Sequence, residues 1–159
     1  MKDISQRCAL LILAAGFEEA ETAAILSLLR QAGLCAKSVS LVSGLVGGAH
    51  GVWFMPDLTL IDLDQLNHPF RISAVILPSG QHSLTKLEAD PRVHKLLRQV
   101  VANRGHIITD REGLRVVRAA AVWCNEPEDI HDDLSMAIIL RKPEEPPGVF
   151  VRDLVRRLK

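Results

Sequence analysis

Apolar residues follow two patterns along the chain: apolar-rich runs and stripes at helical spacing. The clearest run spans residues 8–13 and ends in the small residues 14–16, and further runs lie at 36–43, 74–77 and 107–109. The run at 8–13 is apolar at every position, which is typical of a central strand buried on both faces of a parallel sheet. We therefore predict four strands at these positions.

Apolar positions three and four residues apart predict a helix after the first strand. Ile25, Leu28, Leu29 and Ala32 form this stripe, and Gly33 ends it. Further helices are predicted from Asp90 onward, where an N-cap precedes a proline, and at 127–140 and 151–158. The last helix carries a basic face, which we interpret as solvated: Arg152, Arg156, Arg157 and Lys159.

Shorter strand candidates lie between these elements. Four glycines between residues 44 and 51 predict a hairpin, and 52–54 and 58–61 are interpreted as short edge strands. Residues 114–117 and 119–123 are predicted as two late strands. Strands that alternate with helices indicate an α/β fold with a parallel sheet covered on both faces.

Composition limits the function classes. The 159 residues suit one domain spanning 1–159, and 48% of them are hydrophobic, which fits a globular protein. Nineteen basic residues balance nineteen acidic ones, so we do not expect nucleic acid as a partner. The apolar N-terminal run leads into a charged helix and not into a cleavage site, and no run reaches the roughly 18 residues of a membrane span, so no membrane association is expected.

The three cysteines, Cys8, Cys35 and Cys124, are odd in number and widely spaced. This pattern favours reduced thiols in the cytoplasm over a disulfide framework. No pair has the spacing of a zinc site, and the sequence indicates no cofactor.

Ligands of open parallel sheets bind beyond the carboxyl ends of the strands, so chemistry is expected where these ends meet. Glu21 begins the helical stripe, where partial burial would raise its pKa and let it donate a hydrogen bond. Gly80 follows a Pro-Ser turn and could present backbone N–H groups as an oxyanion hole. The candidate binding residues are Gly16, Glu18, Glu21, Ser79, Gly80 and His82.

Four stretches together resemble the ThiJ/PfpI superfamily of class I glutamine amidotransferase-like proteins. They are residues 9–22, 30–33, 55–60 and 74–80, and the resemblance is strong over 7–105 and weak over 106–159. It implies a flavodoxin-like, doubly wound parallel sheet and a homodimer. Described members are amidases or proteases, glyoxalase- or deglycase-like enzymes, chaperones and sensors in the stress response.

In that family the chemistry implied by the resemblance depends on one cysteine at a strand-to-helix elbow. An acid that matches Glu21 activates it, and it faces a glycine that matches Gly80. Here the corresponding strand is expected to end near Asp110 or Arg111, and neither side chain can be this nucleophile.

Two explanations for the missing cysteine stay open. In the favoured one, the elbow, its helix and the next strand are deleted, and the chain from Glu112 matches the C-terminal part of the family. In the other, Cys124 is a displaced nucleophile.

The function predicted first is that of a divergent family member without cysteine catalysis, which binds a small molecule or a partner. The alternative is a hydrolase or glyoxalase-like enzyme that uses Cys124 with Glu21 and Gly80. Whether the protein is an enzyme is left open.

Overall fold

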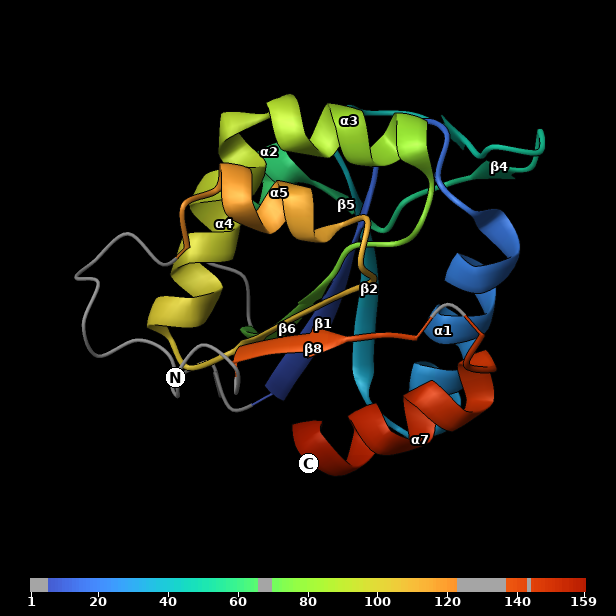
Figure 1. Cartoon of the computed structure of the whole chain (residues 1–159), viewed down its shortest axis with the longest axis vertical. Coiled ribbons are helices and arrows are strands. Elements are labelled where there is room, and N and C mark those ends of the chain that lie inside the picture. The colour runs from blue at the N-terminus through green and yellow to red at the C-terminus, as the bar shows by residue number, and fades with distance from the viewer. Residues whose placement is uncertain (1–5, 66–69, 123–136, 143) are drawn as a thin grey trace.

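The sheet of this protein has six parallel strands in the order β5-β2-β1-β6-β7-β8. The computed structural model describes residues 6–65, 70–122, 137–142 and 144–159 (Figure 1). Helices cover both faces of the sheet, which confirms the predicted doubly wound α/β fold. The elements are β1 (Gln6–Leu13), α1 (Glu19–Gln31), β2 (Cys35–Ser40), β3 (Val46–Gly47), β4 (Trp53–Phe54), β5 (Leu58–Thr59), α2 (Leu60–Gln65), β6 (Phe70–Ile76), α3 (Gln81–Ala89), α4 (Pro91–Ala102), β7 (His106–Thr109), α5 (Leu114–Ala119), β8 (Ile138–Leu140) and α7 (Pro147–Leu158).

Strand β1 lies at the centre and explains why its sequence is apolar at every position. Cys8, Leu10 and Ile12 point to the side covered by α2, α3, α4 and α5, whereas Ala9 and Leu11 point to the side covered by α1 and α7. Successive side chains of a strand face opposite sides, so a strand covered on both sides needs apolar residues throughout. Figure 1 shows these two helical layers on either side of the sheet.

The glycine-rich region forms the predicted hairpin, the antiparallel pair β3–β4. Phe54 packs edge-on against Phe17, with ring centroids 5.0 Å apart. Leu13, Phe17 and Val46 form a small buried cluster beneath it. The hairpin is therefore fixed close to the carboxyl end of β1.

Three predicted elements in the second half of the chain are wrong. Residues 114–117 are not a strand but the core of α5, and residues 119–122 continue from this helix into a turn. Of the predicted helix 127–140, residues 138–140 form β8, and 127–136 lie outside the described residues. Short apolar runs fit a strand or a helix equally well, and here packing against the neighbouring helices decides. Helices α2 and α3 were not predicted, and residues 60–61 of the predicted edge strand 58–61 belong to α2.

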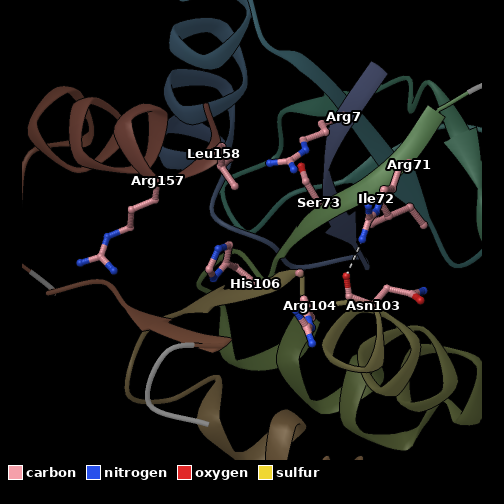
Figure 2. A pocket seen from close by; sticks show the side chains of 10 residues that line it. Arg7, Arg71, Ile72, Ser73, Asn103, Arg104, His106, Arg157 and Leu158 are labelled. Atoms are coloured by element: carbon pink, nitrogen blue, oxygen red, sulfur yellow. Dashed lines mark hydrogen bonds between the residues drawn. The ribbon is translucent and has the colours of Figure 1, made fainter. Parts of the chain in front are cut away.

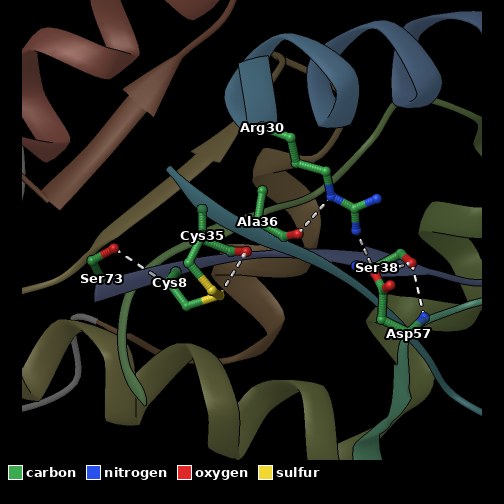
Figure 3. The surroundings of a disulfide bond; sticks show 8 residues. Cys8, Arg30, Cys35, Ala36, Ser38, Asp57 and Ser73 are labelled. Atoms are coloured by element: carbon green, nitrogen blue, oxygen red, sulfur yellow. Dashed lines mark hydrogen bonds and ion pairs between the residues drawn. A yellow bond between two sulfur atoms is a disulfide. The ribbon is translucent and has the colours of Figure 1, made fainter. Parts of the chain in front are cut away.

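The expectation of reduced thiols is wrong for one pair. Cys8 and Cys35 are paired residues on the adjacent strands β1 and β2, with Cα atoms 4.5 Å apart, and they form a disulfide (Figure 3). Strand register brings them together although they are 27 residues apart in sequence. The prediction of a cytoplasmic location rested on reduced thiols, and this pair no longer supports it. Within the described residues, no helix has the length and apolar character needed to cross a membrane.

Candidate functional site

A hollow of about 580 Å³ lies at the edge of the sheet where β6, β7 and β8 end, beside the first turn of α1. We call it the crevice. Its position agrees with the rule that ligands of parallel sheets bind beyond the carboxyl ends of the strands. The crevice is lined by Ala20, Glu21, Ser79, Asp110, Arg111, Glu112, Arg141, Glu144, Glu145, Pro146 and Pro147.

Glu21 lies in the first turn of α1 and forms an ion pair with Arg141, which directly follows β8. Arg141 Nη2 is 2.7 Å from Glu21 Oε1, and the two side chains are only 11% and 16% exposed. Burial raises the pKa of Glu21 above its usual value, although a hydrogen bond from Ser79 and the charge of Arg141 lower it in part. The charges of Asp110 and Glu18 also raise this pKa, so the net direction is upward.

Ser79 connects the acid of α1 with the end of β7. Its hydroxyl donates to Asp110 Oδ2 at 2.7 Å, and Arg141 Nη2 donates to Ser79 Oγ at 2.9 Å. A hydroxyl carries one proton, so Ser79 can donate to Asp110 or to Glu21 but not to both at once. The four side chains Glu21, Ser79, Asp110 and Arg141 form one hydrogen-bonded group, which we call the polar cluster.

Asp110 directly follows β7, at the place where the resemblance led us to expect a nucleophilic cysteine. It is 8% exposed, and its Oδ1 accepts a hydrogen bond from the backbone N–H of Gly113 at 2.8 Å. This bond closes the turn into α5. A turn and helix α5 follow β7, so the deletion hypothesis is wrong for the turn and its helix. Strand β8 pairs with β7, but residues 123–136 lie outside the described residues, so the predicted loss of the next strand stays a prediction.

The other binding candidates lie next to the crevice but do not line it. Gly80 has φ +124°, and its α-carbon faces the backbone of Gly16 and Phe17. A Cβ on Gly16 would in turn lie 2.8 Å from the Cβ of His82. The N–H of Glu18 donates to the carbonyl of Ser79 at 2.9 Å, which ties the start of α1 to the turn after β6. These residues hold the turns that carry Glu21 and Ser79.

A second charged group, which the sequence analysis missed, involves Glu18, Glu19 and His50. Glu19 is 5% exposed and accepts hydrogen bonds from the backbone N–H groups of His50 (2.6 Å) and Val52 (3.2 Å). Burial would raise the pKa of Glu19, but these bonds and the His50 ring hold it at about 2. The ring of His50 is 3.1 Å from Glu19 and 3.6 Å from Glu18, and its own pKa is raised by the hydrogen bond with Glu19 and by the charge of Glu18.

These three side chains lie close enough to bind a metal ion. Glu19, however, uses its carboxylate to fix the loop between β3 and β4, so the group is a loop anchor. No local sequence signal links residues 31 positions apart, which is why the pairing was not predicted.

The remaining candidates concern the cysteines. Cys8 and Cys35 lie near the amino ends of their strands, away from the crevice, and are joined to each other. Cys124 lies outside the described residues. Among the described residues that line the crevice there is no cysteine.

Comparisons with known proteins agree with this architecture. The sequence model of the DJ-1/PfpI family matches residues 7–116, a range that includes Glu21, Ser79 and Asp110 but not Arg141. No curated protein matches by sequence.

Several solved structures share the fold. Oxidized DJ-1 from Toxoplasma gondii is 16% identical with a TM-score of 0.77, over 95% of this chain and 90% of that one. DJ-1beta from Drosophila melanogaster is 22% identical with a TM-score of 0.74, over 96% and 90%. A ThiJ/PfpI domain protein from Brachyspira murdochii is 14% identical with a TM-score of 0.70, over 97% and 96%.

Proposed function

Because the chain belongs to the DJ-1/PfpI family and Asp110 stands at the end of β7, we propose that it is a divergent member whose crevice binds a small molecule without cysteine chemistry. The observation that carries the proposal is the polar cluster. The Asp110 carboxylate accepts hydrogen bonds from the Ser79 hydroxyl and from the backbone N–H of Gly113. An aspartate carries no thiol that could attack a substrate. The cysteine mechanism that the family resemblance implies requires a thiolate at the position of Asp110.

The role of Glu21 also differs from that of an acid serving a thiol. Its carboxylate is paired with Arg141 at 2.7 Å, and this guanidinium also binds Ser79. Both partners are mostly buried, so the pair is held in one geometry in the crevice wall. We propose that Glu21 and Arg141 have a positioning role for the pocket.

The charges around the crevice indicate the class of ligand. Arg141 is paired with Glu21. Among the described lining residues this leaves four carboxylates against one cation, Arg111: Asp110, Glu112, Glu144 and Glu145. An excess of carboxylates attracts cations and disfavours anions. We therefore propose a small polar molecule that carries a cationic group.

A titration with 1,4-diaminobutane, with the neutral butane-1,4-diol as the matched comparison, tests this assignment. We expect the diamine to bind and to shift the backbone amide signals of residues 110–113, and the diol to have no such effect. The variant Glu144→Gln/Glu145→Gln should weaken diamine binding by about fivefold, because two negative charges that line the crevice are lost. Glu88→Gln, on α3 and outside the crevice, is the control. Equal binding of diol and diamine, or equal binding by both variants, would contradict the proposed ligand class.

We also propose that the protein forms a homodimer through the hairpin region. Five large apolar side chains between residues 42 and 55 are more than half exposed: Val42, Leu45, Val52, Trp53 and Met55. A patch of this kind is typical of an interaction surface. Sedimentation should give twice the chain mass of 17.5 kDa, and Trp53→Ser should shift it towards the monomer. A wild-type monomer would contradict this proposal.

A further inference from the structure

A second cavity lies at the opposite edge of the sheet, where β6 and β7 begin. It measures about 180 Å³, and its lining residues include four arginines: Arg7 of β1, Arg71 of β6, Arg104 of the turn after α4, and Arg157 of α7 (Figure 2). The four come from four separate segments of the chain and are brought together only by the fold. Arg157 belongs to the basic face predicted for the last helix, whereas the other three arginines lie in no basic run of the sequence.

The positive charge of this cavity is not neutralised within the described residues. Among the described residues that line it there is no carboxylate. Arg71 donates to the carbonyl of Asn103 at 2.9 Å, but none of the four arginines has an ion pair with a described carboxylate. By contrast, Arg30, Arg92 and Arg141 are each paired with an acid. Because the chain as a whole has no net charge, this concentration is a local feature.

The turn that presents Arg104 is firmly packed. Arg104 has φ +57°, a left-handed backbone that is uncommon for a residue with a side chain. The N–H of Arg104 donates to Val101 at 2.9 Å, and that of Gly105 donates to Val100 at 2.8 Å. A Cβ on Gly105 would lie 2.7 Å from the Val100 side chain and 3.0 Å from the carbonyl of Ser73. The turn is thus fixed against both α4 and β6.

We propose that this cavity binds the phosphate group of a small phosphorylated molecule. Guanidinium groups match phosphate oxygens with paired hydrogen bonds, and several of them favour an anion with more than one charge. A volume of 180 Å³ holds roughly six water molecules, which suits one or two phosphate groups and not a nucleic-acid strand. This cavity is separate from the crevice, so the proposal of a phosphate site does not depend on the proposed function.

Calorimetric titration with pyrophosphate at constant ionic strength tests the site. We use Arg7→Gln/Arg157→Gln, because neither side chain makes a hydrogen bond or ion pair to another described residue. The wild type should bind pyrophosphate, and this variant should bind at least about tenfold more weakly. The control Arg118→Gln/Arg152→Gln removes the same charge from exposed positions outside the cavity and should change binding by less than about twofold.

Amide chemical shifts identify the place of binding. Pyrophosphate should perturb residues 103–106, whereas acetate at the same ionic strength should not. Perturbation at residues 80–82, where α3 begins, would place the anion at the other edge of the sheet and overturn the proposal. Equal losses in the two double variants would also overturn it, because they would show attraction by net charge alone. Acetate binding as tightly as pyrophosphate would overturn the phosphate class.

Discussion

Replacing Arg141 with methionine is expected to lower the free energy of unfolding by about 3 kcal/mol at pH 7. Arg141 Nη2 lies 2.7 Å from Glu21 and 2.9 Å from Ser79, and both charged side chains are mostly buried. Removing one partner of such a pair leaves the other charge buried and uncompensated. Methionine keeps much of the apolar volume of the side chain, so the lost charge is the main effect.

The loss should depend on pH. The pKa of Glu21 is already raised by burial, and without Arg141 it rises further. A group with a raised folded-state pKa contributes stability that is present below its unfolded value, 4.5 for Glu21, and is lost as pH rises through the folded value. Urea unfolding should therefore show a small deficit near pH 4 that grows towards pH 7. A deficit that is the same at both pH values would contradict this explanation.

The double variant Glu21→Gln/Arg141→Met is the control for this effect. It removes both charges, so it should recover most of the stability at pH 7 and show little pH dependence. If it is as unstable as Arg141→Met, the loss comes from packing and not from the buried carboxylate.

Replacing Gly80 with alanine is expected to cost about 3 kcal/mol. Gly80 has φ +124°, which costs an alanine about 1–3 kcal/mol in backbone strain. In addition, the new Cβ would collide with the carbonyl oxygen of Gly16 and lie 3.1 Å from the Cα of Phe17. The turns after β1 and β6 would have to separate, and these turns carry Glu21 and Ser79.

Gly33→Ala is the matched control for the steric part. Gly33 also has a positive φ, +79°, but a Cβ there has nothing within 4 Å. Urea unfolding of the two variants should give a cost of about 1 kcal/mol for Gly33→Ala, clearly below that of Gly80→Ala. Equal costs would show that the two turns do not approach each other closely.

Long periodic segments could be predicted from the sequence, because their patterns are local. The run at 8–13 is the core of β1, and the stripe from Ile25 to Leu29 faces the core from α1. The short runs at 114–117 and 138–140 could not be assigned in the same way. Both are too short for periodicity to decide, and the first is helical while the second is a strand.

The polar cluster was only partly predictable. The sequence pattern located Glu21 and Ser79 near the carboxyl ends of strands. The family resemblance implied that the strand with the expected thiol ends near Asp110 or Arg111. Arg141 was missed because β8 was predicted as part of a helix. Had 138–140 been recognised as a strand, Arg141 would have followed at the same edge. The Cys8–Cys35 pairing depends on strand register, which no local pattern reveals.

We propose that Asp110, Ser79 and Arg141 occupy the place where the family resemblance implies a nucleophilic sulfur, and that this chain uses no activated thiol. The most direct measurement is the rate at which iodoacetamide alkylates Cys124 in the native protein at pH 7, followed by mass spectrometry. We predict the rate of free cysteine, and the same rate in Glu21→Gln. Alkylation far faster than that of free cysteine, and slowed by Glu21→Gln, would show an activated thiol beside Glu21 and contradict the claim.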